Sequence, residues 1–231
     1  SITVGANSSM AFPGVTTLMG EGFPRLYVYG PSSELLLPNL LEISNYQIEV
    51  GSDALFEIPQ LQSIVDSRLN VNGIFEGGQL TELRNTSLDI YSTGTFFAPD
   101  LAEITSDTSD VVRVYGQGIL QLPQLNLLRN IGLYAGSGAQ LVLENLTQFS
   151  VENYCGYTLL DASGVHAEWQ GEEYVIIQRS RISLPALASM NLLSGDWWCG
   201  YAITANYGGE VLLPILNSFV FAEGAGEELL I

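Results

Sequence analysis

A proline-centred frame recurs along the whole chain and limits what the chain can fold into. Seven of the nine prolines take the fourth place of the pattern apolar, x, apolar, Pro, x, apolar, x, x, apolar. With two copies that lack proline and a degenerate copy at Leu160-Asp161, the frame falls at positions 13, 38, 59, 81, 99, 123, 144, 161, 185 and 214. Nine intervals between 13 and 214 give a period of about 22 residues, which is typical of solenoid proteins.

A short alternating segment precedes each proline position by about 11 residues. Apolar residues at every second position predict a half-buried strand. Glycine or serine then follows and permits a sharp turn. Each repeat is therefore predicted to hold a strand, a turn, a second strand and a corner where proline's missing N–H is tolerated. The clearest alternating segments are Ile2-Thr3-Val4, Leu26-Tyr27-Val28-Tyr29, Ile48-Glu49-Val50 and Leu69-Asn70-Val71-Asn72.

Repeats this short cannot bury an apolar face alone, so neighbouring repeats must stack. We predict one all-β domain over 1–231, a right-handed parallel β-solenoid of about ten coils of about 22 residues each. Regular coils are expected over 1–149, irregular, loop-bearing coils near 150–209, and the last coils over 210–231. The alternative is an antiparallel sandwich, which has no reason to repeat one proline-centred frame.

The frame, in the copy Leu120-Gln121-Leu122-Pro123-Gln124-Leu125-Asn126-Leu127-Leu128, resembles leucine-rich β-solenoid repeats of secreted surface proteins. The receptor L domain and its fungal cell-wall relatives are the nearest comparison. The resemblance covers most of the chain and implies adhesion, wall architecture or receptor binding. The chain departs from those proteins because it lacks a flanking cysteine-rich module and an obvious capping helix.

Charge excludes several classes of partner. The chain has 25 acidic residues against 7 basic ones, a net charge of −18, and every basic residue is an arginine. Nucleic-acid binding needs a basic face, and an anionic membrane surface would repel this chain. The longest apolar stretch, 211–222, is too short to span a bilayer, so no membrane insertion is expected. On a solenoid, acidic flanks would resist lateral aggregation while apolar coil ends stay free to pair.

Residues for catalysis are sparse. Lysine is absent, His166 is the only histidine, and the adjacent pairs Glu172-Glu173 and Glu227-Glu228 suit solvated turns better than a paired-carboxylate site. We therefore expect no enzyme activity, no metal site and no cofactor. A weaker hypothesis is a glycan-active enzyme with its site around 166–181.

Several features favour an extracellular or cell-surface location. Asn7, Asn85 and Asn145 begin N-glycosylation sequons, which are weak evidence because such triplets arise by chance. Cys155 and Cys199 occur in matching Cys-Gly-Tyr contexts and are a candidate disulfide, although regular stacking would hold their coils too far apart unless loops converge.

Outward strand positions carry several tyrosines. Tyr29, Tyr91 and Tyr115, together with Trp197, are candidate glycan-facing residues, because an aromatic ring offers an apolar face and a polar tip. The alternative is that tyrosine is simply a good β former on a solvated face.

The two ends of the repeat array look uncapped, and an uncapped coil is an unpaired edge that templates association. We expect an extracellular structural protein that stacks head to tail on copies of itself, as a filament or surface layer. The alternatives are a carbohydrate-binding or adhesion module of a larger surface protein, and a piece cut from a longer array. Candidate assembly residues are Ile2, Val4, Phe12, Phe219, Phe221, Leu229, Leu230 and Ile231.

Overall fold

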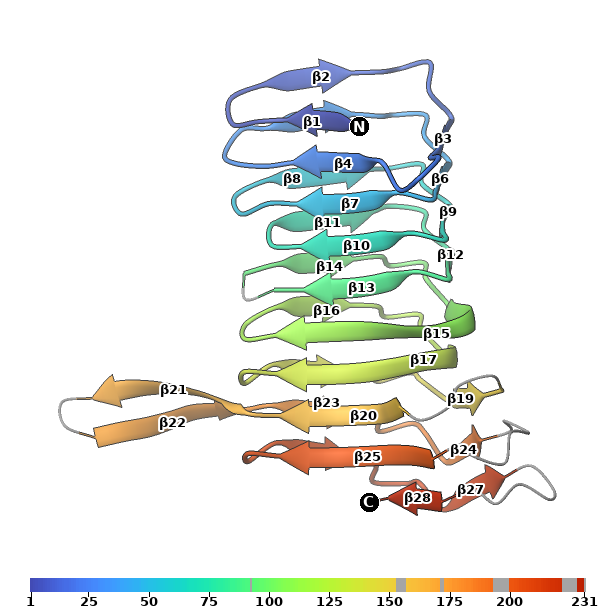
Figure 1. Ribbon diagram of the computed structural model, residues 1–231, viewed down its shortest axis with the longest axis vertical. Helices are drawn as coiled ribbons and strands as arrows, with labels where there is room; N and C mark the ends of the chain where they lie inside the picture. Colours follow the sequence, from blue (N-terminus) through green and yellow to red (C-terminus); the bar gives the residue numbers. More distant parts are fainter. Residues whose placement is uncertain (92, 153–156, 171–172, 193–199, 222–227, 231) are drawn as a thin grey trace. The chain divides into compact units, whose positions relative to one another are not determined.

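The chain forms a stack of parallel β-strands, as predicted (Figure 1). The computed structural model describes residues 1–91, 93–152, 157–170, 173–192, 200–221 and 228–230. The solenoid has about seven turns, about 23 residues apart, so the expected number of coils was slightly too high. Among the described residues, no helix is long and apolar enough to cross a membrane.

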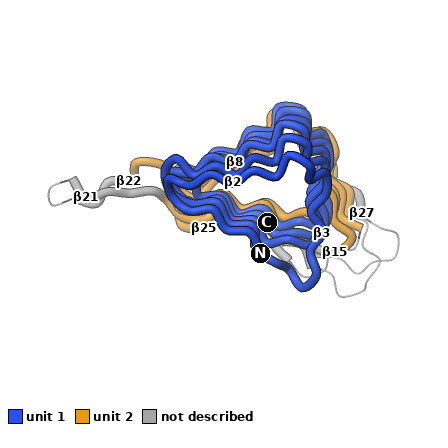
Figure 2. The backbone as a smooth tube through the Cα atoms, turned by 90° about the horizontal axis from the view of Figure 1, so that it is seen from above, with its two compact units in different colours: residues 1–104, 118–125 blue, residues 105–117, 126–231 orange. Residues whose placement is uncertain are grey.

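The chain divides into two compact units, which are described separately (Figure 2). Unit 1 comprises residues 1–104 and 118–125, and unit 2 comprises 105–117 and 126–231.

Unit 1 has three rows of parallel strands, and Figure 2 shows them as three sides around the coil. In rows A and C, each strand pairs in register with the equivalent strand of the next coil, whereas row B is divided between two sheets. Row A contains β1 (Ile2–Val4), β4 (Arg25–Val28), β7 (Gln47–Val50), β10 (Arg68–Val71) and β13 (Ser87–Ile90). Row B contains β2 (Ser9–Ala11), β5 (Glu34–Leu36), β8 (Leu55–Ile58), β11 (Ile74–Gly77), β14 (Thr95–Phe97) and β16 (Ile119–Gln121). Row C contains β3 (Thr17–Met19), β6 (Glu42–Ser44), β9 (Ser63–Val65) and β12 (Glu82–Arg84).

Alternation along these strands creates the core of unit 1. In row A, Leu26 and Ile48 are in register and fully buried, while the next residue of each strand, Tyr27 and Glu49, lies on the outward side and is half-buried. In row B, the ring of Phe75 lies 5.8 Å from that of Phe56 and 5.1 Å from that of Phe96, and all three rings are fully buried. Removing each ring from water contributes about 1.5–3 kcal/mol to folding.

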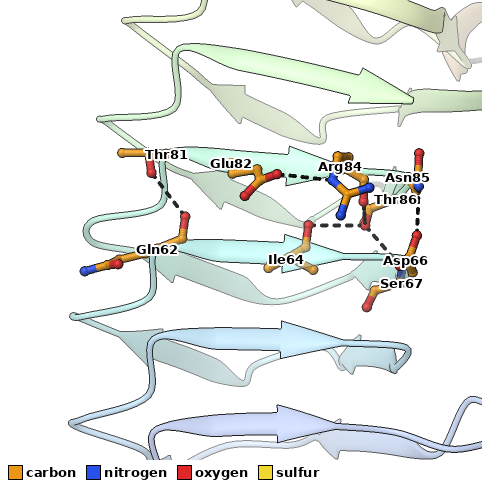
Figure 3. Close-up of polar contacts among 9 residues, drawn as sticks. All are labelled: Gln62, Ile64, Asp66, Ser67, Thr81, Glu82, Arg84, Asn85 and Thr86. Atoms are coloured by element: carbon orange, nitrogen blue, oxygen red, sulfur yellow. Dashed lines mark hydrogen bonds and ion pairs between the residues drawn. The ribbon is translucent and has the colours of Figure 1, made fainter. Parts of the chain in front are cut away.

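Polar side chains close the corner between rows C and A (Figure 3). Asp66 and Asn85 hold left-handed backbone angles there, and Asn85 Nδ2 donates a 2.8 Å hydrogen bond to Asp66 Oδ1 on the neighbouring coil. The hydroxyl of Thr86 accepts a 3.2 Å bond from the Ser67 N–H and donates a 2.9 Å bond to Arg84 O. These bonds satisfy polar groups that the corner buries.

Unit 2 repeats the arrangement with less regular strands. One row runs through the longest strands and the other two through shorter ones, and the described strands pair parallel within each row. The first row contains most of β15 (Glu103–Tyr115), with β17 (Leu127–Gly136), β20 (Tyr157–Ser163), β25 (Gly200–Asn206) and β28 (Glu228–Leu230). The second row contains β18 (Gln140–Val142), β23 (Arg181–Ser183) and β26 (Glu210–Leu212). The third row contains β19 (Gln148–Val151), β24 (Ser189–Leu192) and β27 (Ser218–Phe221).

The expected irregularity near 150–209 includes an inserted hairpin. Strands β21 (Val165–Gln170) and β22 (Glu173–Arg179) pair antiparallel between β20 and β23. The degenerate frame placed at Leu160 was wrong, because Leu160 lies in β20, in register with Leu133 and Ile203. The interval from 144 to 185 is therefore a single coil enlarged by a hairpin, which accounts for one of the surplus coils.

Candidate functional site

The outward side of row A brings tyrosines from neighbouring positions together. Thr3, Tyr27 and Glu49 are in register on adjacent strands and form one outward column. A second column, which contains Tyr29 and Gly51, follows at the strand ends. The Tyr29 N–H donates a 3.0 Å hydrogen bond to Val4 O, and the Gly51 N–H donates a 2.8 Å hydrogen bond to Val28 O. Both columns belong to unit 1.

Tyr27 and Tyr29 form a stacked pair, named here the tyrosine platform. Their ring centroids are 4.7 Å apart and the ring planes differ by 28°. Tyr29 is 40 % exposed and Tyr27 is half-buried, so part of the platform faces solvent. Residues two apart on a strand share a face, which explains why the two rings meet.

Glycines on both sides make room for the platform. A Cβ at Gly5 would lie 2.9 Å from Tyr29 Oη, and one at Gly51 would lie 2.7 Å from the Cβ of Tyr29. Real Cβ atoms essentially never come so close, so larger residues would displace the rings. The platform therefore depends on small residues in the coils before and after it.

Polar groups border the platform. Gln47 Nε2 donates a 2.6 Å hydrogen bond to Glu49 Oε1, and Glu49 is the strand neighbour of Tyr27. Arg25 is exposed and pairs in register with Gln47. The stacked rings are thus edged by a carboxylate, an amide and a guanidinium group, which together donate and accept hydrogen bonds.

Further along row A the surface becomes ionic. Asp89 is almost fully buried and contacts Arg68, whose Nη2 lies 3.2 Å from Asp89 Oδ2. Asn70, the register partner of Asp89, has an Oδ1 atom that is buried without a hydrogen-bond partner among the described residues. The tyrosine platform lies on β4, and this ionic pair lies further along row A, on β10 and β13.

A second tyrosine pair occurs in unit 2. The rings of Tyr115 and Tyr134 are 5.3 Å apart and tilted by 50°, and a Cβ at Gly136 would collide with the ring of Tyr134. Burial and the Asp161 carboxylate raise the pKa of Tyr134 above its ordinary value of 10.0, which outweighs the opposite effect of Arg113. These two rings are further from parallel than the rings of the tyrosine platform.

The predicted glycan-facing residues therefore have different surroundings. Tyr29 and Tyr115 each belong to an aromatic pair, and Tyr91 is half-buried in the column of Tyr29. Trp197 lies outside the described residues, as do Cys155 and Cys199. The sequence placed Tyr27 in an alternating strand but did not indicate the contact of its ring with Tyr29. The Tyr-x-Tyr spacing with glycine in both adjacent coils is the signal that could have identified it.

The three sequon asparagines also differ. Asn7 and Asn145 lie in exposed turns, whereas Asn85 is half-buried and its amide nitrogen already donates to Asp66. The next sequon residue, Thr86, is 1 % exposed. Glycosylation at each site stays a prediction, and Asn85 would require the corner to open.

The outermost described coils are less well buried than their neighbours. At one end, Ile2 and Phe12 are half-buried, although Val4 is buried. At the other, Val211 and Phe219 are half-buried, whereas their register partners Ile182 and Met190 are fully buried. The side chains of Phe221, Leu229 and Leu230, and all of Ile231, lie outside the described residues.

The residues of the weaker enzyme hypothesis fall in the hairpin β21–β22. The side chain of His166 and all of Glu172 lie outside what the structure describes, as does the side chain of Glu173. In the described part of the chain, no group of three or more His, Cys, Asp or Glu side chains could hold a metal ion.

No protein-family model, curated protein or solved structure matches this chain.

Proposed function

We propose that this chain is a carbohydrate-binding module of an extracellular or cell-surface adhesion protein, with the tyrosine platform as its stacking site. The supporting observation is the stacked ring pair of Tyr27 and Tyr29, which is partly exposed and given space by Gly5 and Gly51. The C–H face of a pyranose ring packs on a tyrosine ring, because both are apolar and of similar size.

The platform's border suits a neutral sugar. Glu49, Gln47 and Arg25 can together accept hydrogen bonds from sugar hydroxyls and donate to them. The net charge of −18 repels acidic polysaccharides at low ionic strength. The ligand class that fits is therefore an uncharged glycan.

The row geometry favours an extended glycan chain over a single sugar. Tyr91 follows Tyr29 in the same outward column, three strands further along row A. At the usual spacing of parallel strands, this places the two residues about 14 Å apart. Several linked rings would be needed to reach both.

The test is a binding screen of the intact protein against soluble neutral and acidic polysaccharides, by affinity electrophoresis. We expect at least one neutral polysaccharide to retard the protein, and Tyr29→Ala to weaken that binding about three- to tenfold. Tyr207→Ala is the matched control, because Tyr207 is an 87 % exposed tyrosine in unit 2 that belongs to neither aromatic pair. Retardation by acidic polysaccharides alone, or equal weakening by both variants, would contradict the proposal.

A second candidate function is end-to-end association into a filament or surface layer. The half-buried state of Val211 and Phe219, against full burial of Ile182 and Met190 one coil away, supports it. An apolar coil face with open strand edges is covered most simply by another coil, here proposed to come from a second copy. Sedimentation velocity should then show species larger than monomers as concentration rises. Monomers alone across salt and pH would overturn this candidate.

A further inference from the structure

Row B of unit 1, whose strands β2, β5, β8, β11, β14 and β16 are labelled in Figure 1, carries a separate surface. This surface combines apolar and acidic side chains. Its outward positions include aliphatic residues that are between 41 % and 48 % exposed, namely Leu36, Leu55, Ile74 and Ile119. Interspersed with them are three carboxylates, Glu34, Glu57 and Glu76, the first two exposed and the third half-buried. Exposed aliphatic residues that adjoin one another often mark a binding surface.

The hydrogen-bonded ladder of row B is interrupted between β5 and β8. Strand β5 pairs with β2, and β8 pairs with β11, but β5 and β8 belong to different sheets. A shallow groove of about 250 Å³ lies at this interruption. Its lining includes Leu36 and Leu55, and the carboxylate residues Glu34 and Glu57. Pro38 and Pro59 add further apolar surface.

The groove is uniformly acidic among its charged residues. The three arginines of unit 1, Arg25, Arg68 and Arg84, lie in rows A and C. Row B is described completely, and its outward positions include no basic residue. Glu57 and Glu76 are in register on adjacent strands, where like charges repel, so a bound cation would relieve the repulsion.

We propose that this groove binds a cationic, amphipathic peptide segment of another protein. The aliphatic stem of a lysine or arginine would lie along Leu36 and Leu55, with its charged head between Glu34 and Glu57. Flanking apolar residues of the partner would cover Ile74. A second copy of this chain fits poorly, since the chain has no lysine and each copy carries a net charge of −18.

The test uses fluorescence anisotropy of a labelled peptide of alternating leucine and lysine, titrated with the intact protein. The double variant Glu34→Gln/Glu57→Gln is compared with Glu42→Gln/Glu103→Gln, which removes the same two charges from outside row B. We expect the groove variant to weaken binding about tenfold and the control variant less than twofold. Equal weakening by the two would show a general attraction to an acidic protein and would overturn the proposal.

Two further arms test the apolar part of the groove. Leu55→Ser should weaken binding of the same peptide severalfold, whereas Ile215→Ser, which changes a 51 % exposed residue of unit 2, should not. A peptide of alternating leucine and glutamate should not bind. Binding of that acidic peptide, or no effect of Leu55→Ser, would contradict the groove as the site. Both readouts are independent of carbohydrate binding.

Discussion

Gly51 lies directly beside Tyr29 on the adjacent strand, so close that a Cβ at position 51 would come within 2.7 Å of the Cβ of Tyr29. The same Cβ would lie 3.5 Å from a ring carbon of Tyr27. The absence of a side chain at this position is therefore part of how the tyrosine platform is built. A methyl group there would force one ring or the backbone to move.

The first prediction is that Gly51→Ala disturbs the platform. Overpacking of this kind costs about 1–3 kcal/mol, and the displaced Tyr29 ring should also reduce binding of a neutral polysaccharide. Chemical denaturation and affinity electrophoresis measure the two effects. Gly14→Ala is the control, because a Cβ at Gly14 would meet nothing within 4 Å. Unchanged stability and binding in Gly51→Ala would show that the rings do not depend on this glycine.

A second prediction concerns the buried phenylalanine column of row B. Phe75 contacts the rings of both Phe56 and Phe96, so Phe75→Ala should lower the free energy of unfolding by about 3–5 kcal/mol. Phe97 faces outward and is half-buried, so Phe97→Ala should cost clearly less. Urea denaturation followed by circular dichroism gives both values. Equal losses would mean that the two side chains do not differ in burial in solution.

The corner drawn in Figure 3 yields a third prediction. Thr86→Val removes a buried hydroxyl that bonds to Ser67 N and Arg84 O, and should cost about 1–3 kcal/mol. Thr81→Val removes only an exposed 3.3 Å bond to Gln62 O and should cost less than about 0.5 kcal/mol. Thermal unfolding of the two valine variants makes the comparison. Similar melting temperatures would contradict a stabilising role of the buried Thr86 hydrogen bonds at this corner.

The fourth prediction is a pH effect at Tyr134. Burial, together with Asp161, raises its pKa, so the folded state favours the neutral phenol. Its contribution to stability is complete below the unfolded pKa near 10 and is lost as pH rises through the higher folded value. Ultraviolet difference titration should show that Tyr134→Phe removes an ionisation above pH 10. Loss of an ionisation at or below pH 10 would contradict the raised pKa.

The sequence alone predicted the strand rows, because the proline frame and the alternation around Leu26, Ile48 and Leu69 repeat in nearly every coil. It misplaced one frame at Leu160, since an apolar residue inside a long strand satisfies the same short pattern. It anticipated Tyr29 as an outward residue but not the rings' contact. The sequence does not predict the groove at β5 and β8. Both strands follow the same proline-centred frame, although the hydrogen-bonded ladder of row B is interrupted between them.

The most direct test of the carbohydrate-binding proposal is saturation-transfer NMR on the intact protein with a neutral oligosaccharide of the polysaccharide that binds. Selective irradiation of aromatic protons should transfer saturation to the C–H protons on one face of the sugar rings. We predict that Tyr29→Ala abolishes most of this transfer, whereas Tyr207→Ala leaves it unchanged. Transfer that persists in full in Tyr29→Ala would contradict the tyrosine platform as the binding site.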